Sequence, residues 1–371
     1  MIKSFEIKNF RCFEHTKAVG FSRINLIGGR NNAGKTALLE ALLLMGKPSN
    51  QSIARLLGFR EVSKKFIEEM PQKAWNNFFY QQNNTKKISF NFVLDDKTDN
   101  KVTINCDEKI DDFISMKDEQ NEDIMSEFAN SLANTNAVKS SLHINADADN
   151  TNLQTNVFVA SPNGLAGKGI PHIFIDTYLI PASFRLKNDK LAIEFDKAKF
   201  EGNSEALLKA FQIVDSIVEE ITAFKLSNDA ELFLKRKNED YMSLSLFGDA
   251  MNKIANFILR IVNNKDSILL IDEIENGIHY ENQEEIWKVL FELCEKYNVQ
   301  LFATSHSYEM IEAFKNTIVK NNLQNGNYFE MGRHSISNKI TIQKIPINSL
   351  ENKINNERPI RGEQTNKRKL S

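Results

Sequence analysis

One eight-residue segment limits what this chain can fold into more than any other part of the sequence. It reads Gly29-Arg30-Asn31-Asn32-Ala33-Gly34-Lys35-Thr36 and matches G-x-x-x-x-G-K-[ST] at every fixed position. Residues 23–27 before it predict a short strand, and residues 36–45 after it are strong helix formers. This order of strand, loop and helix is the context that the pattern requires, so the sequence predicts a phosphate-binding loop.

Each residue type in this loop has a physical reason. Glycines let the backbone curl around phosphate oxygens, while loop N–H groups and the helix N-terminus present positive potential to them. We expect Lys35 to reach the β- and γ-phosphates and to act in catalysis, and Thr36 to give a hydroxyl ligand to Mg²⁺. The predicted ligands are therefore ATP and Mg²⁺, with the nucleotide bound by Gly29, Asn31, Asn32, Ala33, Gly34, Lys35, Thr36 and Ala37.

A second candidate element is an apolar run at residues 267–271 that ends in Asp272 and Glu273. The run predicts a buried central strand, and ligands of α/β proteins bind at the carboxyl ends of such strands. We expect Asp272 to hold Mg²⁺ and Glu273 to orient and deprotonate the attacking water. An acid pair of this kind can also mark a helix N-terminus, but the phosphate-binding loop upstream favours the catalytic interpretation.

The next buried strand, predicted at residues 299–303, ends in a hydroxyl-rich turn that contains His306. A lone histidine is usually a polar residue with its hydrogen bonds satisfied. Here the histidine follows the strand next to the acid strand along the chain, so we expect His306 to sense the γ-phosphate.

Bulk properties place the protein among ordinary cytoplasmic proteins. The 371 residues carry a formal net charge of −2, so the overall charge does not indicate a nucleic-acid-binding protein. Three widely spaced cysteines fit neither a disulfide framework nor a zinc site. The N-terminus has no signal pattern, and the apolar stretches are shorter than the roughly 20 residues that a bilayer requires, so no membrane partner is expected.

Strands and helices alternate at both ends of the chain, which predicts an α/β fold with a mostly parallel core sheet. The middle predicts an antiparallel strand pair, at residues 87–94 and 101–106, within an inserted helical and loop region. The remaining expectations are surface loops at 107–123 and 145–156, a buried strand at 172–181, helices at 204–224, 250–262, 283–296 and 308–315, and an edge strand at 338–345.

These elements resemble the ABC-type ATPases of the RecF/SMC group, especially the small prokaryotic "AAA family" ATPases akin to overcoming-lysogenisation-defect proteins. The likeness lies in residues 7–13, the loop 29–36 including Asn32, the segment 269–279 and the turn 304–307. It implies a P-loop ABC-type ATPase head built from residues 1–45 and 240–362. Residues 46–239 would be an inserted β/helical region, and residues 363–371 a flexible basic tail.

The resemblance also implies a signature turn at residues 243–253, where Ser245, Gly248 and Asp249 would bind the nucleotide of an opposite protomer. Relatives often have Gly-Asp-Gly there, but this chain has Ala250 at the last position. The glycine would allow closer backbone approach. An ordinary turn and helix start is the alternative. If the resemblance holds, the chain forms a homodimer or a higher homo-oligomer around ATP.

Two biological roles stay open. Larger relatives carry a nuclease domain that needs aspartates for two metal ions, and no aspartate follows Asp272 in this sequence. We therefore expect an ATPase that regulates a separately encoded effector, a nuclease or toxin, in phage defence. The alternative is a DNA-binding repair ATPase of the RecF kind, in which the basic cluster 235–237 would contact DNA phosphates.

Overall fold

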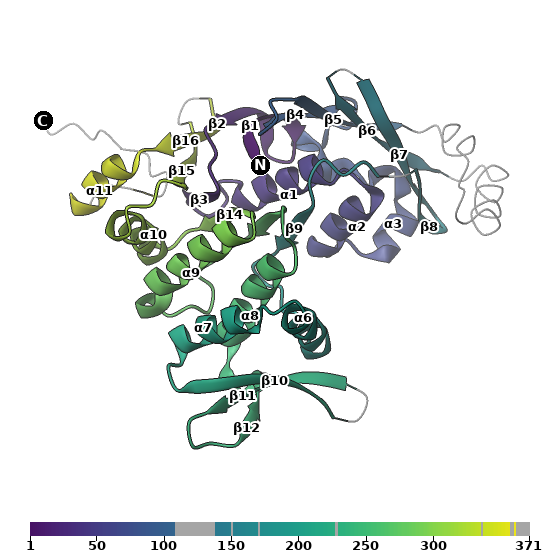
Figure 1. Ribbon diagram of the computed structural model, residues 1–371. Coiled ribbons are helices and arrows are strands. Elements are labelled where there is room, and N and C mark those ends of the chain that lie inside the picture. The colour runs from purple at the N-terminus through teal and green to yellow at the C-terminus, as the bar shows by residue number, and fades with distance from the viewer. Residues whose placement is uncertain are drawn as a thin grey trace, which may run out of the picture. The chain divides into compact units, whose positions relative to one another are not determined.

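The computed structural model describes residues 1–107, 138–149, 151–169, 171–226, 229–334, 337–356 and 360 (Figure 1). The chain forms two compact units. The first comprises Met1–Gly20, Thr36–Thr177 and Gly332–Gln343, and the second comprises Phe21–Lys35, Tyr178–Met331 and Lys344–Ser371. The predicted division between ATPase head and insertion stays a prediction, and the predicted tail at 363–371 lies outside the described residues.

The first unit is built on a seven-stranded antiparallel sheet in the order β2-β1-β4-β5-β6-β7-β8. Its strands are β1 (Ile2–Phe10), β2 (Phe13–Val19), β4 (Ile88–Leu94), β5 (Asp99–Asp107), β6 (Ser140–Ala148), β7 (Thr151–Ser161) and β8 (Gly164–Lys168). Its helical segments are α1 (Lys35–Gly46) from Thr36 onward, α2 (Asn50–Phe59), α3 (Lys64–Glu69), η1 (Pro71–Lys73), η2 (Asn76–Phe78) and η3 (Tyr80–Gln82). The predicted antiparallel strand pair is confirmed as β4 and β5.

The loop predicted at residues 145–156 is wrong, because residues 145–148 and 151–156 form the facing ends of β6 and β7. Their Asn and Asp content suggested a loop, but Leu142, Ile144 and Ala146 alternate along β6 and are buried. An apolar residue at every second position is typical of a strand, even when the residues between are polar. Those polar side chains can find partners on the neighbouring strand. Thr155, for example, donates through Oγ1 to Asn145 Oδ1 over 2.8 Å. The loop predicted at 107–123 lies almost wholly outside the described residues.

The second unit contains a six-stranded sheet in the order β16-β15-β3-β14-β13-β9, with helices packed around it (Figure 1). Neighbours along β15-β3-β14-β13 are parallel, as predicted for the core. The strands are β3 (Ile24–Gly29), β9 (Thr177–Ile180), β13 (Ile268–Ile271), β14 (Gln300–Ser305), β15 (Gly326–Arg333) and β16 (Ile340–Ile345). The helical segments are α6 (Asn188–Phe200), α7 (Ser204–Val214), η4 (Leu244–Phe247), α8 (Asp249–Val262), η5 (Tyr280–Asn282), α9 (Gln283–Lys296), α10 (Tyr308–Lys320) and α11 (Ile347–Asn355).

A separate three-stranded antiparallel sheet corrects the helix predicted at 204–224. It consists of β10 (Val218–Leu226), β11 (Asp229–Arg236) and β12 (Tyr241–Ser243), so the predicted helix ends at Val214 as α7. The β-branched residues Val218, Ile221 and Thr222 prefer a strand once a partner strand is available, and β11 supplies it. The partner lies later in the sequence, so local spacing could not reveal it.

The strand predicted at 172–181 is also too long, because only Thr177–Ile180 pairs as β9. The backbone N–H groups of Phe174 and Ile175 instead both donate to the carbonyl of Gly46, at 3.0 and 3.2 Å. These hydrogen bonds satisfy donors that a strand would have paired with a neighbouring strand.

The parallel core of the second unit is apolar on both faces. All four residues of β13 and all six of β14 are buried, as in sheets covered by helices on both sides. On one of these covering helices, Trp287 packs edge-on at 4.9 Å from the Phe314 ring of α10. Because β3, β13 and β14 are parallel, their carboxyl ends meet at one edge of the sheet, where the segments after Gly29, Ile271 and Ser305 lie together.

In the first unit, a buried carboxylate is clamped by two guanidinium groups. Glu40 of α1 is 1% exposed, and its two oxygens accept from Arg11 Nε at 2.8 Å and from Arg60 Nε at 2.7 Å. Burial lowers the pKa of Arg11, and the charge of Glu40 opposes that shift. The clamp joins the end of β1 to α1 and to the end of α2.

Replacing Glu40 by Ala leaves the mostly buried Arg11 charge without its partner. The free energy of unfolding should fall by about 3 kcal/mol, as when one partner of a buried ion pair is removed. Urea denaturation followed by circular dichroism measures the loss. Glu69→Ala is the control, since Glu69 is exposed and, among the described residues, its ion pair is with Lys65 at 3.7 Å. Equal losses in both variants would show that the clamp contributes no more than a surface pair.

Candidate functional site

The phosphate-loop residues lie between β3 and α1, as predicted, with Gly29 as the last residue of β3 and Lys35 and Thr36 as the first two of α1. Asn32 and Gly34 have φ of 61° and 98°, a left-handed conformation that glycine and asparagine adopt most readily. Two glycines are required by close approach of β15. A Cβ on Gly28 would lie 2.0 Å from the Tyr328 hydroxyl, and one on Gly29 would lie 2.6 Å from the carbonyl oxygen of Met331.

Lys35, the first residue of α1, is buried, and its ammonium is held by the loop itself. Its Nζ donates to the carbonyl oxygens of Gly29 at 2.7 Å and Arg30 at 3.0 Å. Burial lowers the pKa of Lys35, while the charges of Glu275, Asp272 and Glu273 oppose that effect. The positive charge therefore stands in the field of three carboxylates from the β13 end. Thr36 and Ala37 follow as the next residues of α1.

The two predicted acids are joined through one hydroxyl. Thr304 Oγ1 donates to Asp272 Oδ1 at 2.6 Å and accepts from the backbone N–H of Glu273 at 2.9 Å. The next residue, Ile274, donates from its N–H to the Thr304 carbonyl at 3.0 Å. Glu273 has a φ of 49°, which is unusual for a residue other than glycine and is held by these bonds. Asp272 is buried, whereas the Glu273 side chain is 36% exposed.

His306 lies against two carboxylates. Its Nδ1 is 2.9 Å from Glu275 Oε1 and 3.9 Å from Glu273 Oε1. The other oxygen of Glu273 accepts from Asn276 Nδ2 at 2.8 Å. The structure thus brings Lys35, Asp272, Glu273 and His306 to one edge of the sheet.

Three residues of this constellation were given no role by the sequence analysis: Thr304, Glu275 and Asn276. Their contacts cross between two strands, so no local pattern shows them. The sequence feature that could have indicated two of them is their distance from the predicted catalytic residues. Glu275 follows Glu273 by two positions, and Thr304 precedes His306 by two. The predicted catalytic residues were thus each accompanied by a polar neighbour that could support them.

The acidic side chains suit Mg²⁺ as that ion is usually bound in nucleotide sites. Mg²⁺ takes one or two protein oxygens and completes its shell with phosphates and water. The carboxylate of Asp272, buried directly after β13, is an oxygen donor of this kind. Among the described residues no group of three or more His, Cys, Asp or Glu side chains could by itself hold a metal ion.

Two of the predicted signature residues, Ser245 and Gly248, are exposed at the turn before α8. Ser245 belongs to η4, Gly248 is the N-cap of α8, and Asp249 is the first residue of that helix. Gly248 has a φ of 81°, a conformation that a side chain would strain. The adjacent Leu246 is 74% exposed, so the turn offers both backbone and apolar surface to solvent.

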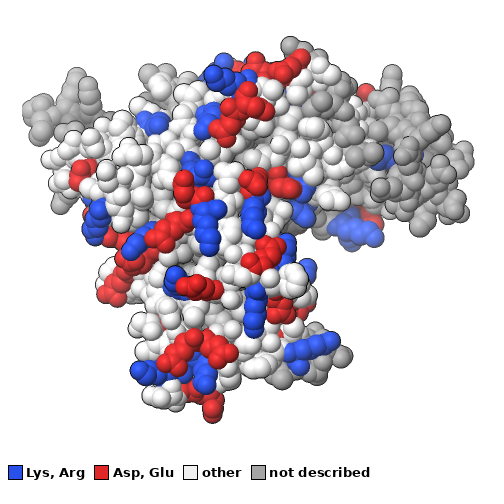
Figure 2. Space-filling view, viewed as in Figure 1, with Lys and Arg blue, Asp and Glu red and all other residues white. Residues whose placement is uncertain are grey.

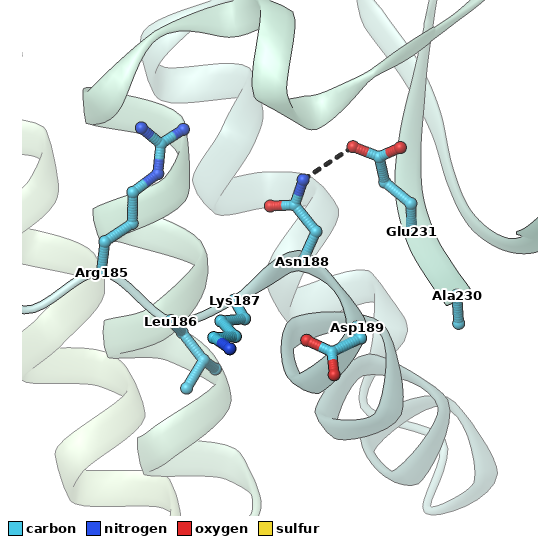
Figure 3. Close-up of a pocket in the computed structure, with 7 residues that line it drawn as sticks. All are labelled: Arg185, Leu186, Lys187, Asn188, Asp189, Ala230 and Glu231. Atoms are coloured by element: carbon cyan, nitrogen blue, oxygen red, sulfur yellow. Dashed lines mark hydrogen bonds between the residues drawn. The ribbon is translucent and has the colours of Figure 1, made fainter. Parts of the chain in front are cut away.

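A pocket of about 620 Å³ lies between the segment that leads into α6 and strand β11 (Figure 3). Asn188 Nδ2 donates to Glu231 Oε1 at 2.7 Å across it. Glu231 also accepts from the hydroxyl of Ser243, which lies 2.6 Å from that of Ser245. The contacts of Ser245 therefore run to β11 and the start of α6. The pocket is lined by Arg185, Leu186, Lys187, Asn188, Asp189, Ala230 and Glu231.

A parallel sheet whose strand ends carry a phosphate loop, two acids and a histidine defines a P-loop ATPase of the AAA/ABC type. The chain belongs to the family described as "AAA domain, putative AbiEii toxin, Type IV TA system", which matches residues 24–312. The described helices include none with the length and apolar character needed to cross a membrane.

Individual proteins are similar over different lengths. An "ATP/GTP phosphatase" of Helicobacter pylori is 25% identical over 333 residues, which cover 86% of this chain and 88% of that protein. A "DNA double-strand break repair Rad50 ATPase" of Archaeoglobus fulgidus is 48% identical over 44 residues, or 12% of this chain and 5% of that protein. A solved SMC head bound to the C-winged helix domain of ScpA shares 10% identity at a TM-score of 0.49, with 95% of this chain and 99% of that chain covered.

Thr304→Val tests whether the hydroxyl organises the acids. The change keeps the shape but leaves Asp272 Oδ1 and the Glu273 N–H without this partner, which should cost about 2 kcal/mol of unfolding free energy. Urea denaturation measures it. The matched control is Thr317→Val, a buried threonine whose hydroxyl, within the part of the chain that the structure describes, donates to the backbone carbonyls of Ala313 and Glu284. If both variants lose the same amount, the link between the acids has no special energetic role.

Proposed function

We propose that this protein is an ATP-driven switch that hydrolyses ATP with Mg²⁺, dimerises on ATP and regulates a separately encoded nuclease or toxin in phage defence. One observation carries the hydrolytic part. A single hydroxyl fixes Asp272 inward and leaves Glu273 partly exposed beside His306. That arrangement separates an acid suited to a metal ion from one suited to an incoming water.

In this proposal Lys35 exchanges the loop carbonyls for the β- and γ-phosphates, and the loop N–H groups hold the remaining phosphate oxygens. Thr36 and Asp272 would hold Mg²⁺, which neutralises phosphate charge when bound. Glu273 takes a proton from the attacking water while the water oxygen bonds to the γ-phosphorus. The bond from that phosphorus to the β,γ-bridging oxygen breaks at the same time. His306, at the neighbouring strand end, contacts the γ-phosphate. The products are ADP and phosphate.

Dimerisation would complete each site with the signature turn of the other protomer. The exposure of Ser245, Leu246 and Gly248 supports this part of the proposal, since those groups are available to a second chain. Hydrolysis would remove the γ-phosphate that both chains grip and so separate them.

The family description names a putative toxin of a type IV TA system for the domain itself, and it supports a role in a system of this kind. The separate partner, a nuclease or toxin whose release follows the nucleotide state, is our proposal. This part is independent of the hydrolytic chemistry and needs its own test.

The alternative role, DNA binding in repair, finds little support in the basic cluster on β11. Arg236 is paired with Asp215 through two nitrogens, at 2.5 and 2.6 Å, and Lys235 lies over the Tyr241 ring. On the face seen in Figure 2, Lys and Arg side chains are mixed with Asp and Glu instead of forming a basic field. Strong phosphate binding requires clustered, available cations.

Two substitutions test the hydrolytic site. Lys35→Ala should abolish nucleotide binding, because the phosphates lose their charged donor. Glu273→Gln should bind ATP normally but hydrolyse it at least about 100-fold more slowly, since the base is gone. It should also accumulate as an ATP-bound dimer in light scattering after size exclusion. Wild-type hydrolysis by Glu273→Gln would refute the assignment of the base.

Co-purification from the native host tests the effector. Tagged wild-type protein should bring down a nuclease or toxin, identified by mass spectrometry, and ATP should change its release. In Glu273→Gln the ATP-dependent state should persist, and in Lys35→Ala ATP should have no effect. Tight DNA binding with a steep dependence on salt, and no such partner, would instead establish the repair role.

A further inference from the structure

The carboxylate of Glu275 fastens two strand ends together. This side chain is only 9% exposed. Its Oε1 accepts from the backbone N–H groups of His306 at 2.7 Å and Ser307 at 3.2 Å. The same oxygen lies 2.9 Å from His306 Nδ1. One atom from the turn after β13 therefore holds both the backbone and the ring at the end of β14.

The contact also favours one position for the histidine proton. The two atoms are not aligned as a hydrogen bond, but at 2.9 Å a lone pair on Nδ1 and the carboxylate oxygen would repel each other, which favours the tautomer with the proton on Nδ1. The second acid, Glu273, is on the same Nδ1 side at 3.9 Å. Nε2 lies on the far side of the ring from Glu275.

A purely structural role does not explain the other half of this side chain. Oε2 of Glu275 is buried, and no hydrogen-bond donor among the described residues reaches it. A buried carboxylate oxygen without a partner is costly, and a neutral acceptor could hold the same backbone N–H groups more cheaply. Its charge is also the foremost of the three acid charges that act on Lys35. The acid is therefore placed to serve the site.

We propose that Glu275 is a positioning residue for ATP hydrolysis, which acts by holding the His306 ring with its Nδ1 proton toward the acids and Nε2 toward the nucleotide. The inference rests on the hydrolytic role of His306 proposed above. Glu275 itself would touch neither nucleotide nor water. We expect its effect on turnover to pass through His306, and the double variants below separate this route from its charge on Lys35.

Steady-state hydrolysis of the full-length protein tests this with Glu275→Ala, Glu275→Gln, His306→Ala and both double variants. Glu275→Ala should lower kcat by on the order of 100-fold, as for a misplaced catalytic group, and change the Kd for ATP less than threefold. Glu275→Gln can still accept from both backbone N–H groups, so it should recover at least tenfold of that loss. If Glu275→Ala does not fold, Glu275→Gln still tests the inference.

The double variants decide whether Glu275 works through the histidine. Adding either Glu275 substitution to His306→Ala should change kcat less than twofold, because residues that act as a unit are not additive. A further loss as large as in the wild-type background would overturn the inference. Glu309→Gln is the matched control, since Glu309 accepts from the Ser307 hydroxyl in the same turn and should keep wild-type kcat.

Histidine ¹⁵N spectra give a readout that needs no hydrolysis. The chain has six histidines, and the His306 signals are those missing from His306→Ala. In the wild type they should show Nδ1 protonated, and in Glu275→Ala this preference should be lost. Unchanged signals in Glu275→Ala would overturn the inference. If the wild type hydrolyses no faster than Lys35→Ala, the proposed hydrolysis fails, and the spectra alone then decide on Glu275.

Discussion

The parallel register of β13, β14 and β3 is the constraint on which the candidate site depends. Ile271 lies opposite Ala303, and Ala303 opposite Leu26, so the chain leaves β13 beside Thr304. Only this pairing lets the Thr304 hydroxyl lie between Asp272 and Glu273. A slip of one residue would turn Thr304 to the opposite face of the sheet and carry the acids away from it. The wholly buried, apolar strands that set the register are therefore as much a part of the site as its polar groups.

Much of the fold and site could be predicted where the signal is contiguous in sequence. The loop at Gly29–Thr36, the acids after an apolar strand and the turn with His306 each lie in one short segment, and the structure brings them to one sheet edge. The parallel core followed from alternating strands and helices. Which chemical role each residue has stays a prediction, since geometry alone does not measure turnover.

The failures arose where contacts with another segment of the chain override local preference. Residues 218–226 are spaced like a helix, but their pairing with β11 makes them a strand. The polar ends of β6 and β7 look like a loop in composition, but a buried alternation and a partner strand order them. Glu275 and Thr304 went without a role for the same reason, because each works on a residue that lies about 30 positions away.

The bonds that Lys35 makes to the Gly29 and Arg30 carbonyls give nucleotide binding the character of an exchange. The ammonium group of Lys35 has already lost most of its water and already occupies a defined position. A phosphate can therefore accept a hydrogen bond from this group only by displacing the two loop carbonyl oxygens. The measured affinity for nucleotide then reflects the difference in free energy between the bonds of Lys35 to the loop carbonyls and its bonds to the phosphates. The loop keeps its shape without a ligand, and the strength of its internal bonds sets how readily nucleotide leaves. A switch of this construction can be tuned by changing the empty state as well as the filled one.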